Sequence, residues 1–354
     1  MSMTCNGFRG LAPTEFRPGP GVNVIRGGNA QGKTSLLEAL LYLVTSKSHR
    51  TNSEADLMQY GQRGFQIRAA FQRNDREVRI EANWWDNAKR FKVNDVAQTR
   101  ISDILGKVHL VFFSPEDVDL VRGSAAQRRR FLDMEISQIA PAYLHALQQY
   151  RQALRQRNEL LRRPPVDPVQ LDVWDAQLAA HGETVQAERD GFVNQLNTWA
   201  ADVYSRIADG EPLRLRYRPD IRAGATFTDV LRNARGSDLR QGVTTRGPHR
   251  DEVEIEVAER DARRFGSQGQ QRTAALALKF AELELIRARC DEYPLLLLDD
   301  VLSELDADRS QRMFGALNGA VQVILTTTDL TDHDGLYGAD CTFFRIQEGR
   351  LDTD

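Results

Sequence analysis

The chain has 354 residues, of which 41% are hydrophobic and 27% charged, and its formal net charge is −3. This composition is typical of a globular protein with about two domains, and no apolar run approaches the roughly 20 residues that span a bilayer, so we expect no membrane partner. Three distant cysteines argue against a disulfide framework or a zinc site and favour a reducing cytoplasm. The net charge alone argues mildly against nucleic-acid binding, although a basic surface can be local.

The first 120 residues predict a mixed α/β region. Residues 22–25 predict a short buried strand, and residues 34–44 predict a helix rich in Leu and Ala. Further strands are predicted where β-branched and aromatic residues alternate with polar ones, at residues 65–71, 77–84, 90–93 and 108–113.

From residue 123 to residue 210 the pattern becomes helical. Leu144, Leu147, Tyr150 and Leu154 recur at helical spacing. Two prolines at 164–165 interrupt the pattern, which resumes over residues 171–207. We therefore predict a small helical hairpin or bundle inserted into the α/β region.

Beyond the insertion, strands and helices alternate again. The predicted strands cover residues 213–217, 253–257, 295–298 and 321–326, and the predicted helices cover 270–289 and 307–317. Alternation at both ends of the chain predicts one α/β sheet assembled from both ends. We expect a head formed by residues 1–122 and 211–354, with an α-helical arm domain at 123–210.

One segment fits the phosphate-loop pattern G-x-x-x-x-G-K-[ST] between the first strand and the first helix. Glycines let successive N–H groups point at phosphate oxygens, and the following helix adds its positive end. Lys33 would neutralise the β- and γ-phosphates of ATP, and Thr34 would ligate Mg²⁺. The expected binding residues are Gly27, Gly28, Asn29, Ala30, Gln31, Gly32, Lys33, Thr34 and the adjoining Ser35.

Two carboxylates follow the apolar run at residues 295–298. Such a run predicts a buried parallel strand that delivers acids to the carboxyl edge of the sheet, where ligands bind. We expect Asp299 to hold Mg²⁺, directly or through water, and Asp300 to orient or deprotonate the attacking water. Asp300 and Lys33 are thus the expected catalytic residues.

A serine–glycine element, residues 267–270, precedes the helix at 270–289. Ser267 can cap that helix, and Gly269 exposes N–H groups beside it, so Ser267, Gln268, Gly269 and Gln270 form a second expected anion site. In ATPases of the ABC type, such an element contacts the γ-phosphate held by a second head. The segment 303–306 resembles the D-loop of that class, which adds Asp306 to the interface and predicts an ATP-dependent homodimer.

Taken in order, the motifs at residues 112–117, 128–133, 247–252, 267–270 and 297–306 closely resemble those of the RecF family of bacterial recombination mediators. The resemblance extends from about residue 8 to residue 328. It implies an ABC-type ATPase head related to SMC proteins, with a short helical arm. It also implies slow, DNA-stimulated ATP hydrolysis, binding to gapped or single-strand/double-strand junction DNA, and partnership with RecR in loading the recombinase during repair and replication restart. The expected location is the cytoplasm, at the nucleoid.

Some positions depart from common ABC patterns. Asp300 stands where most ABC ATPases have Glu, and we expect its shorter side chain to contribute to slow turnover. Residues 326–328 are threonines where transporters carry a switch histidine, and we expect a hydroxyl there to contact the γ-phosphate instead. No clear glutamine marks the Q-loop, and residues 114–117 are its expected replacement.

Two regions are candidates for DNA contact. Between residues 122 and 163 there are nine basic and three acidic side chains. Arg151 and Arg155 are four residues apart and share a helix face, which could follow phosphates without reading bases. Arg128, Arg129 and Arg130 belong to the same basic region. The second candidate is the loop after the nucleotide helix, with Lys47 and Arg50, where we expect His49 to be a surface residue.

The leading interpretation is a DNA-binding ATPase that acts as a switch, and it has three alternatives. A transporter subunit is excluded because 234 positions separate Lys33 from Ser267, far more than in that class. An SMC-type organiser is excluded because the insertion has fewer than a hundred residues. A scaffold that uses ATP only to hold a dimer together stays open.

Overall fold

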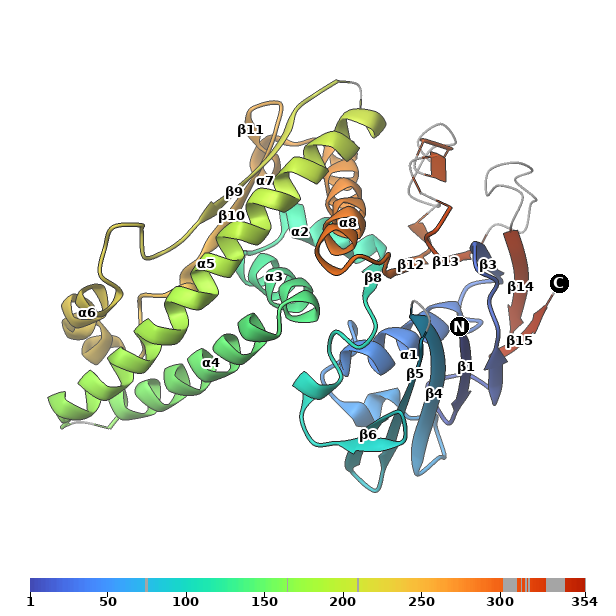
Figure 1. Cartoon of the computed structure of the whole chain (residues 1–354), viewed down its shortest axis with the longest axis horizontal. Helices are drawn as coiled ribbons and strands as arrows, with labels where there is room; N and C mark the ends of the chain where they lie inside the picture. The colour runs from blue at the N-terminus through green and yellow to red at the C-terminus, as the bar shows by residue number, and fades with distance from the viewer. Residues whose placement is uncertain are drawn as a thin grey trace. The chain divides into compact units, whose positions relative to one another are not determined.

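The computed structural model describes residues 1–73, 76–163, 165–208, 210–301, 311, 312, 314, 315, 317, 319–328 and 341–353. The chain forms two compact units, which are described separately. Unit 1 comprises residues 1–117 and 279–354, and unit 2 comprises residues 118–278. Figure 1 labels their helices and strands.

A six-stranded sheet in unit 1 has the order β15-β14-β3-β13-β12-β8. Strands β3, β8, β12, β13 and β14 run parallel to one another, and β15 is antiparallel to its neighbour β14. This sheet draws strands from both ends of the chain, which confirms the prediction. Its members are β3 (Val22–Arg26), β8 (Leu110–Phe113), β12 (Leu295–Asp299), β13 (Val323–Thr327), β14 (Cys341–Gln347) and β15 (Arg350–Thr353).

Unit 1 also contains an antiparallel sheet, in the order β2-β1-β4-β5-β6-β7, that we did not anticipate as a separate layer. Helix α1 (Lys33–Thr45) contacts strands of both sheets. All its described residues from Leu36 to Thr45 are buried, because the helix lies between two apolar sheet faces. The strands are β1 (Ser2–Asn6), β2 (Thr14–Phe16), β4 (Gly64–Arg73), β5 (Arg76–Trp85), β6 (Ala88–Val93) and β7 (Val96–Gln98).

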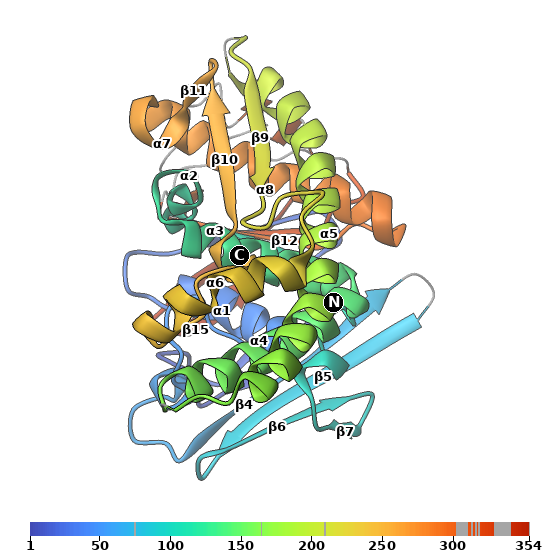
Figure 2. The ribbon, with the colours of Figure 1, turned by 90° about the vertical axis from the view of Figure 1, so that its left-hand side faces the viewer.

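Unit 2 combines helices with a small antiparallel sheet, β11-β10-β9. Helices α4 and α5 pack against each other as the predicted hairpin, and Figure 2 shows them crossing beside α6. The helices are α2 (Asp119–Arg122), α3 (Ala125–Ile139), α4 (Pro141–Leu161), α5 (Pro168–Ile207), α6 (Phe227–Gln241) and α7 (Ala262–Phe265). The strands are β9 (Leu213–Arg218), β10 (Glu252–Val257) and β11 (Arg260–Asp261).

Helix α8 (Gln268–Cys290) begins in unit 2 and ends in unit 1. Short 3₁₀ helices complete the fold at Glu54–Leu57, Ile101–Asp103, Pro115–Val118 and Pro248–Arg250. No helix in the described part of the chain has the length and apolar character needed to cross a membrane.

The compact units do not share the boundaries expected at residues 123 and 210. Strands β9 and β10, which we assigned to the head, lie in unit 2 because β9 packs on α5 and β10 packs on α3. Helix α6 and the β14–β15 hairpin were not predicted. The predicted helix at 307–317 and the segment 303–306 with Asp306 fall largely outside the described residues.

Candidate nucleotide-binding site

The phosphate loop connects the end of β3 with the start of α1, as predicted. Gly27 N donates to Thr327 O at 3.3 Å, which ties the loop to β13. A Cβ on Gly27 would lie 2.5 Å from Ile346 O, so only glycine fits without displacing that strand. Gly32 has a φ of 110°, in the left-handed region that glycine readily adopts. The backbone therefore requires glycine at both positions.

Lys33 is buried within its own loop. Its Nζ atom donates to Gly27 O at 2.7 Å and to Gly28 O at 2.8 Å. Burial lowers the pKa of Lys33, and the nearby charges of Asp300 and Asp299 oppose that shift. Both acceptors are backbone carbonyls, and no carboxylate among the described residues is in hydrogen-bond contact with the ammonium group, which is therefore available to an anion.

Three oxygen-bearing side chains meet at the carboxyl edge of β12 and β13. Asp299 Oδ1 accepts from Thr34 Oγ1 at 3.0 Å and from Thr326 Oγ1 at 2.7 Å. Burial raises the pKa of Asp299, although both hydroxyl hydrogen bonds act in the opposite direction. A buried carboxylate beside a hydroxyl is a suitable donor set for Mg²⁺, which prefers oxygen ligands and would compensate the charge. Thr34 and Asp299 are thus placed together as the predicted metal site requires.

Asp300 follows Asp299 at the end of β12. Its φ is 52°, and its N–H donates to Thr326 Oγ1 at 2.9 Å. Thr326 therefore binds both acidic residues, and its hydroxyl is engaged there rather than free to meet a phosphate. In the expected Q-loop replacement, Asp117 Oδ2 accepts from Ser114 N at 2.7 Å.

A hairpin that the sequence motifs did not indicate contacts the phosphate loop. Gln31 Oε1 accepts from Glu348 N at 2.6 Å, and Gln31 O accepts from Gly349 N at 3.0 Å. Glu348 and Gly349 form the turn between β14 and β15, and both have positive φ. A Glu-Gly pair between two alternating segments is a hairpin signal that could have revealed this contact.

The serine–glycine element forms the start of α8, in unit 2. Ser267 Oγ accepts from Gln270 N at 3.2 Å, and Gln270 Oε1 accepts from Ser267 N at 2.8 Å, so the predicted helix cap is confirmed. Gln270 Nε2 donates to both carboxylate oxygens of Glu211 at 2.8 and 2.9 Å. Ser267 and Gln268 are exposed, and Gly269 is half-buried.

The loop after α1 carries the exposed side chains of Lys47 and Arg50. Ser48 Oγ donates to Glu38 Oε1 at 2.5 Å, and Arg9 binds the same carboxylate at 2.8 and 2.9 Å. These bonds fasten the loop to a buried residue of α1. His49 is not the surface residue that we expected, because its ring packs on Phe112 with 4.5 Å between centroids, and burial lowers its pKa to about 4.

The arginines expected to contact DNA differ in burial. Arg128 is only 6% exposed and binds Glu252 through Nε and Nη2 at 2.7 and 2.9 Å, so it is not available to DNA in this structure. Arg129 is half-buried and donates to Asp251 O at 2.7 Å, whereas Arg130 is exposed. Arg151 is exposed but bonds to Asp133 at 2.6 Å, and Arg155 is exposed.

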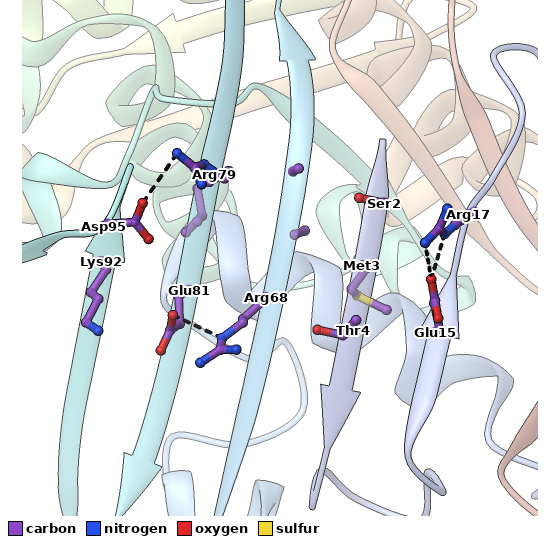
Figure 3. Close-up of a pocket in the computed structure, with 13 residues that line it drawn as sticks. Ser2, Met3, Thr4, Glu15, Arg17, Arg68, Arg79, Glu81, Lys92 and Asp95 are labelled. Carbon is purple, nitrogen blue, oxygen red and sulfur yellow. Dashed lines mark hydrogen bonds and ion pairs between the residues drawn. The ribbon is translucent and has the colours of Figure 1, made fainter.

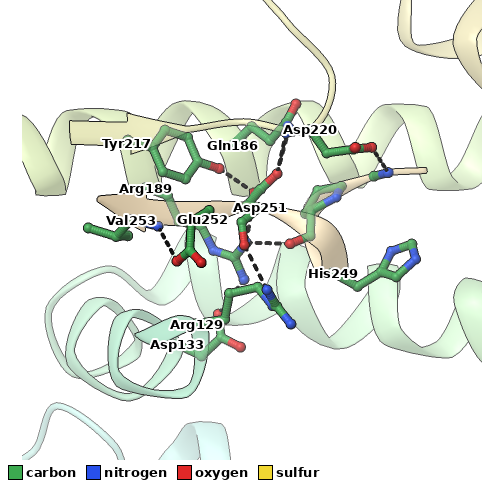
Figure 4. A network of polar contacts seen from close by, with 12 residues as sticks. Arg129, Asp133, Gln186, Arg189, Tyr217, Asp220, His249, Asp251, Glu252 and Val253 are labelled. Atoms are coloured by element: carbon green, nitrogen blue, oxygen red, sulfur yellow. Dashed lines mark hydrogen bonds and ion pairs between the residues drawn. The ribbon is translucent and has the colours of Figure 1, made fainter. Parts of the chain in front are cut away.

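The motif at residues 247–252 forms the centre of a buried polar network in unit 2 (Figure 4). Asp251 accepts from Arg189 Nη1 at 2.8 Å and from the Tyr217 hydroxyl. Arg189 also binds Asp133 at 2.8 Å, which links α3, α5, β9 and β10. This family motif therefore serves the packing of unit 2 through Asp251, a role that the sequence did not indicate.

A depression of about 490 Å³ lies on the outer face of the antiparallel sheet in unit 1 and not at the phosphate loop. Figure 3 shows three ion pairs across it, and their N···O distances run from 2.6 to 3.3 Å. The three pairs balance in charge, and Lys92 also lines the depression. The pairs are Arg17 with Glu15, Arg68 with Glu81, and Arg79 with Asp95.

Comparison with known proteins identifies the family of the chain. The family model described as RecF/RecN/SMC N terminal domain matches residues 1–335. The DNA replication and repair protein RecF of Bacillus cytotoxicus is 40% identical over 94% of this chain and 92% of its own length. The RecF of Pediococcus pentosaceus is 39% identical over 93% of this chain and 92% of its own length.

Solved structures show the same relationship. A structure described as the recombination mediator protein RecF-ATP in the RecFOR pathway matches with a TM-score of 0.92 and 32% identity, covering 100% of this chain and 96% of that one. A Smc head matches with a TM-score of 0.60 at 15% identity, covering 100% of this chain and 96% of that one, which shows a shared fold only. The mixed α/β fold is thus that of an ABC-type ATPase head with a helical insertion, and the chain belongs to the RecF family.

Proposed function

We propose that the chain binds ATP with Mg²⁺ at the phosphate loop and uses the bound nucleotide to control its binding to DNA. The observation that supports this most directly is the approach of Thr34 Oγ1 to Asp299 Oδ1, at 3.0 Å, beside the buried ammonium of Lys33. When bound there, Mg²⁺ would neutralise phosphate charge and fix the phosphate geometry. The similar RecF structure that contains ATP supports the same assignment.

Each side chain at this edge has a distinct proposed task. Lys33 exchanges its two carbonyl acceptors for the β- and γ-phosphates, and the N–H groups from Gly28 to Ser35 surround the phosphate oxygens. Thr34 and Asp299 hold the cation. Asp300 orients or deprotonates the attacking water, and its shorter reach relative to glutamate contributes to slow, DNA-stimulated hydrolysis. If Asp300→Glu did not raise the hydrolysis rate, that account of slow turnover would be wrong.

The second anion site is proposed to act between two copies of the chain. Ser267 and Gln268 are exposed at the start of the 23-residue helix α8, where N–H groups and the helix dipole favour an anion. We propose that Ser267 to Gln270, with Asp306, contact the ATP held by the phosphate loop of a second subunit. The ATP-dependent homodimer follows from that arrangement.

The DNA and protein partners come from the family. We propose that the ATP-bound dimer binds gapped or single-strand/double-strand junction DNA and cooperates with RecR in loading the recombinase, in the cytoplasm at the nucleoid. The relatives are named for DNA replication and repair and for the RecFOR pathway. The proposed phosphate contacts are the exposed or half-buried side chains of Lys47, Arg50, Arg129, Arg130, Arg151 and Arg155.

Subunit mass with and without ATP tests the proposal. The wild-type chain should change from monomer to dimer on addition of ATP and Mg²⁺. Lys33→Met should lose ATP binding, while Ser267→Arg should bind ATP and stay monomeric. Normal dimerisation of Ser267→Arg would overturn the shared ATP site.

A scaffold that uses ATP only to hold the dimer together is separated by a second measurement. Single-turnover hydrolysis is followed with and without gapped DNA, and we expect slow cleavage that DNA accelerates. A dimer that forms on ATP and never cleaves it would favour the scaffold and remove the proposed role of Asp300.

A further inference from the structure

Two exposed aromatic side chains lie on neighbouring segments of unit 1. Tyr60 is 102% exposed and Trp85 is 53% exposed, and Phe265 is the only other exposed large aromatic side chain among the described residues. The exposed ring of Tyr60 contributes nothing to the core. Tyr and Trp are enriched at binding interfaces, because each combines an apolar ring with a polar group.

Contacts within unit 1 hold these two segments beside each other. Gly64 pairs with Trp85 in the β4–β5 register, and the Trp85 indole covers the position that a Cβ on Gly64 would occupy. Arg63 Nη2 bonds to Asp86 Oδ1 at 3.0 Å, which joins the segment after Tyr60 to the turn after Trp85. The two rings are therefore carried by one end of the antiparallel sheet, at the lower left of Figure 2, where β5 turns into β6.

The same end of the sheet is joined to the loop after α1. Lys89 Nζ, on β6, donates to Ser46 O at 2.7 Å and to Glu54 Oε1 at 2.6 Å. The loop is in turn fastened to α1 through Ser48 and Glu38. The aromatic pair thus adjoins the loop that carries Lys47 and Arg50.

Charge on these segments favours a polyanion over an apolar protein surface. Residues 46–63 and 85–90 together carry five basic and three acidic side chains, although the whole chain has a net charge of −3. Two of the basic side chains, Arg63 and Lys89, pair with Asp86 and Glu54. Exposed aromatic rings among basic side chains are the arrangement that binds single-stranded nucleic acid, because rings stack on unpaired bases while cations follow the backbone. Duplex DNA keeps its bases stacked internally and offers no free base face.

We propose that Tyr60 and Trp85 form a stacking site for unpaired bases of single-stranded DNA, with the basic side chains of residues 46–54 and 85–90 following its backbone. This inference rests on the proposed DNA-binding function and supplies the part of it that distinguishes a single strand from a duplex. The ligand class is single-stranded DNA of any sequence, since every base has a face that can stack.

The test uses the full chain with ATP and Mg²⁺ and three DNAs of equal length: an oligo-thymidine strand, a single strand of abasic sugars, and a blunt duplex. The abasic strand keeps the phosphates and removes the bases. We expect the wild-type chain to prefer the thymidine strand over the abasic strand by about tenfold, which lies within the range for a base on an aromatic ring.

Matched variants separate stacking from apolar contact. Tyr60→Phe keeps a ring face and should retain the preference, whereas Tyr60→Leu and Trp85→Leu keep apolar bulk and should each lose most of it. Duplex affinity should change less than twofold in all three variants. Trp85 fluorescence should be quenched by the thymidine strand, and Trp85→Leu should remove most of that quenching, because Trp84 is buried and Trp174 and Trp199 are half-buried on α5.

Several outcomes would overturn the stacking site. One is a preference that survives both Leu substitutions, and another is an equal loss on all three DNAs with a folded variant. Unchanged DNA binding combined with loss of ATP-dependent dimer mass would instead assign the rings to a protein contact. If the wild-type chain bound no DNA while still binding ATP, the proposed DNA function would fail first, and that result differs from every one above.

Discussion

The phosphate loop of unit 1 and the buried network of unit 2 both carry residues of the family motifs, yet they are built in opposite ways. Lys33 donates to two carbonyl oxygens of its own loop, and within the part of the chain that the structure describes it has no carboxylate in hydrogen-bond range. Arg189 is bonded to two carboxylates, Asp251 and Asp133, and to the carbonyl of Pro248. The lysine of the loop can therefore bind an anionic ligand, whereas the arginine of the network is already paired with carboxylates of the chain.

The kind of hydrogen-bond partner distinguishes a buried lysine or arginine that can bind a ligand from one that stabilises packing. The sequence motifs alone do not make this distinction. A buried charge whose hydrogen bonds are complete within the chain stabilises packing only as long as every partner stays. A buried charge held by neutral groups can exchange them for a stronger anion. The comparison predicts that substitutions in the network affect stability most and substitutions in the loop affect ligand binding most.

The largest expected effect is on the free energy of unfolding of Arg189→Met. The substitution leaves Asp251 without its arginine and leaves Asp133 with Arg151 alone, and removing one partner of a buried pair typically costs about 3–5 kcal/mol. Lys33→Met should lose less, about 1–3 kcal/mol, since it gives up two hydrogen bonds to carbonyls that each contribute about 0.5–1.5 kcal/mol. Urea unfolding of both variants measures the difference.

Arg130→Met is the matched control for that comparison, because Arg130 is exposed on α3. Its stability should stay within about 0.5 kcal/mol of the wild type. Equal stability losses in Arg189→Met and Lys33→Met would show that the two regions do not differ as their contacts indicate.

A second pair of substitutions examines the loop itself. Gly27→Ala places a methyl group 2.5 Å from Ile346 O, whereas at Gly28 the nearest atom is Gln31 Cγ at 3.7 Å. Overpacking against backbone should destabilise Gly27→Ala by about 1–3 kcal/mol and displace the loop from β14. Gly28→Ala should be nearly neutral in urea unfolding, and a larger loss there than at Gly27 would contradict the contact geometry.

These regions also show what the sequence could and could not predict. The apolar run of β12 is buried on both faces, which is why residues 295–298 identified a strand and placed Asp299 at its end. Thr326 was missed as the hydroxyl that binds Asp299, because its position opposite Asp299 depends on the β12–β13 register. Arg128 and Arg130 are indistinguishable within a basic run, since the burial of Arg128 depends on Glu252, 124 positions away. A repeating pattern records local structure, whereas these contacts are set by tertiary packing.

A third prediction concerns pH and the loop after α1. Burial lowers the pKa of His49 to about 4 from its ordinary 6.5, so between those values the unfolded chain binds a proton that the folded chain does not. Stability from this residue is complete above pH 6.5 and is lost as pH falls towards 4. We expect about 1 kcal/mol, because His49 is partly exposed and its charge is screened.

His49→Phe removes that titration and keeps a ring against Phe112. The free energy of unfolding of the variant and of the wild type is measured at pH 7.5 and pH 4.5, and the wild type should lose about 1 kcal/mol more than the variant on acidification. A smaller loss in the wild type than in the variant would mean that protonation of His49 stabilises the folded loop.

The smallest expected effect on stability belongs to the exposed arginines of α4, and it isolates the DNA surface. Arg155 is exposed, whereas Arg157, two positions along the same helix, is fully buried and bonds to Asp175 and Asp238 at 2.6 and 2.7 Å. Arg151→Ala with Arg155→Ala should change unfolding by under about 1 kcal/mol. If both side chains neutralise phosphates, the slope of log K for DNA against log salt should fall in magnitude by about 2.

Arg157→Ala should instead lower stability as Arg189→Met does, without being a phosphate contact. If the double variant kept both the slope and the affinity, α4 would not be the DNA surface, and the loop after α1 would remain a candidate. The contrast between exposed and internally paired arginines would then predict stability but not DNA binding.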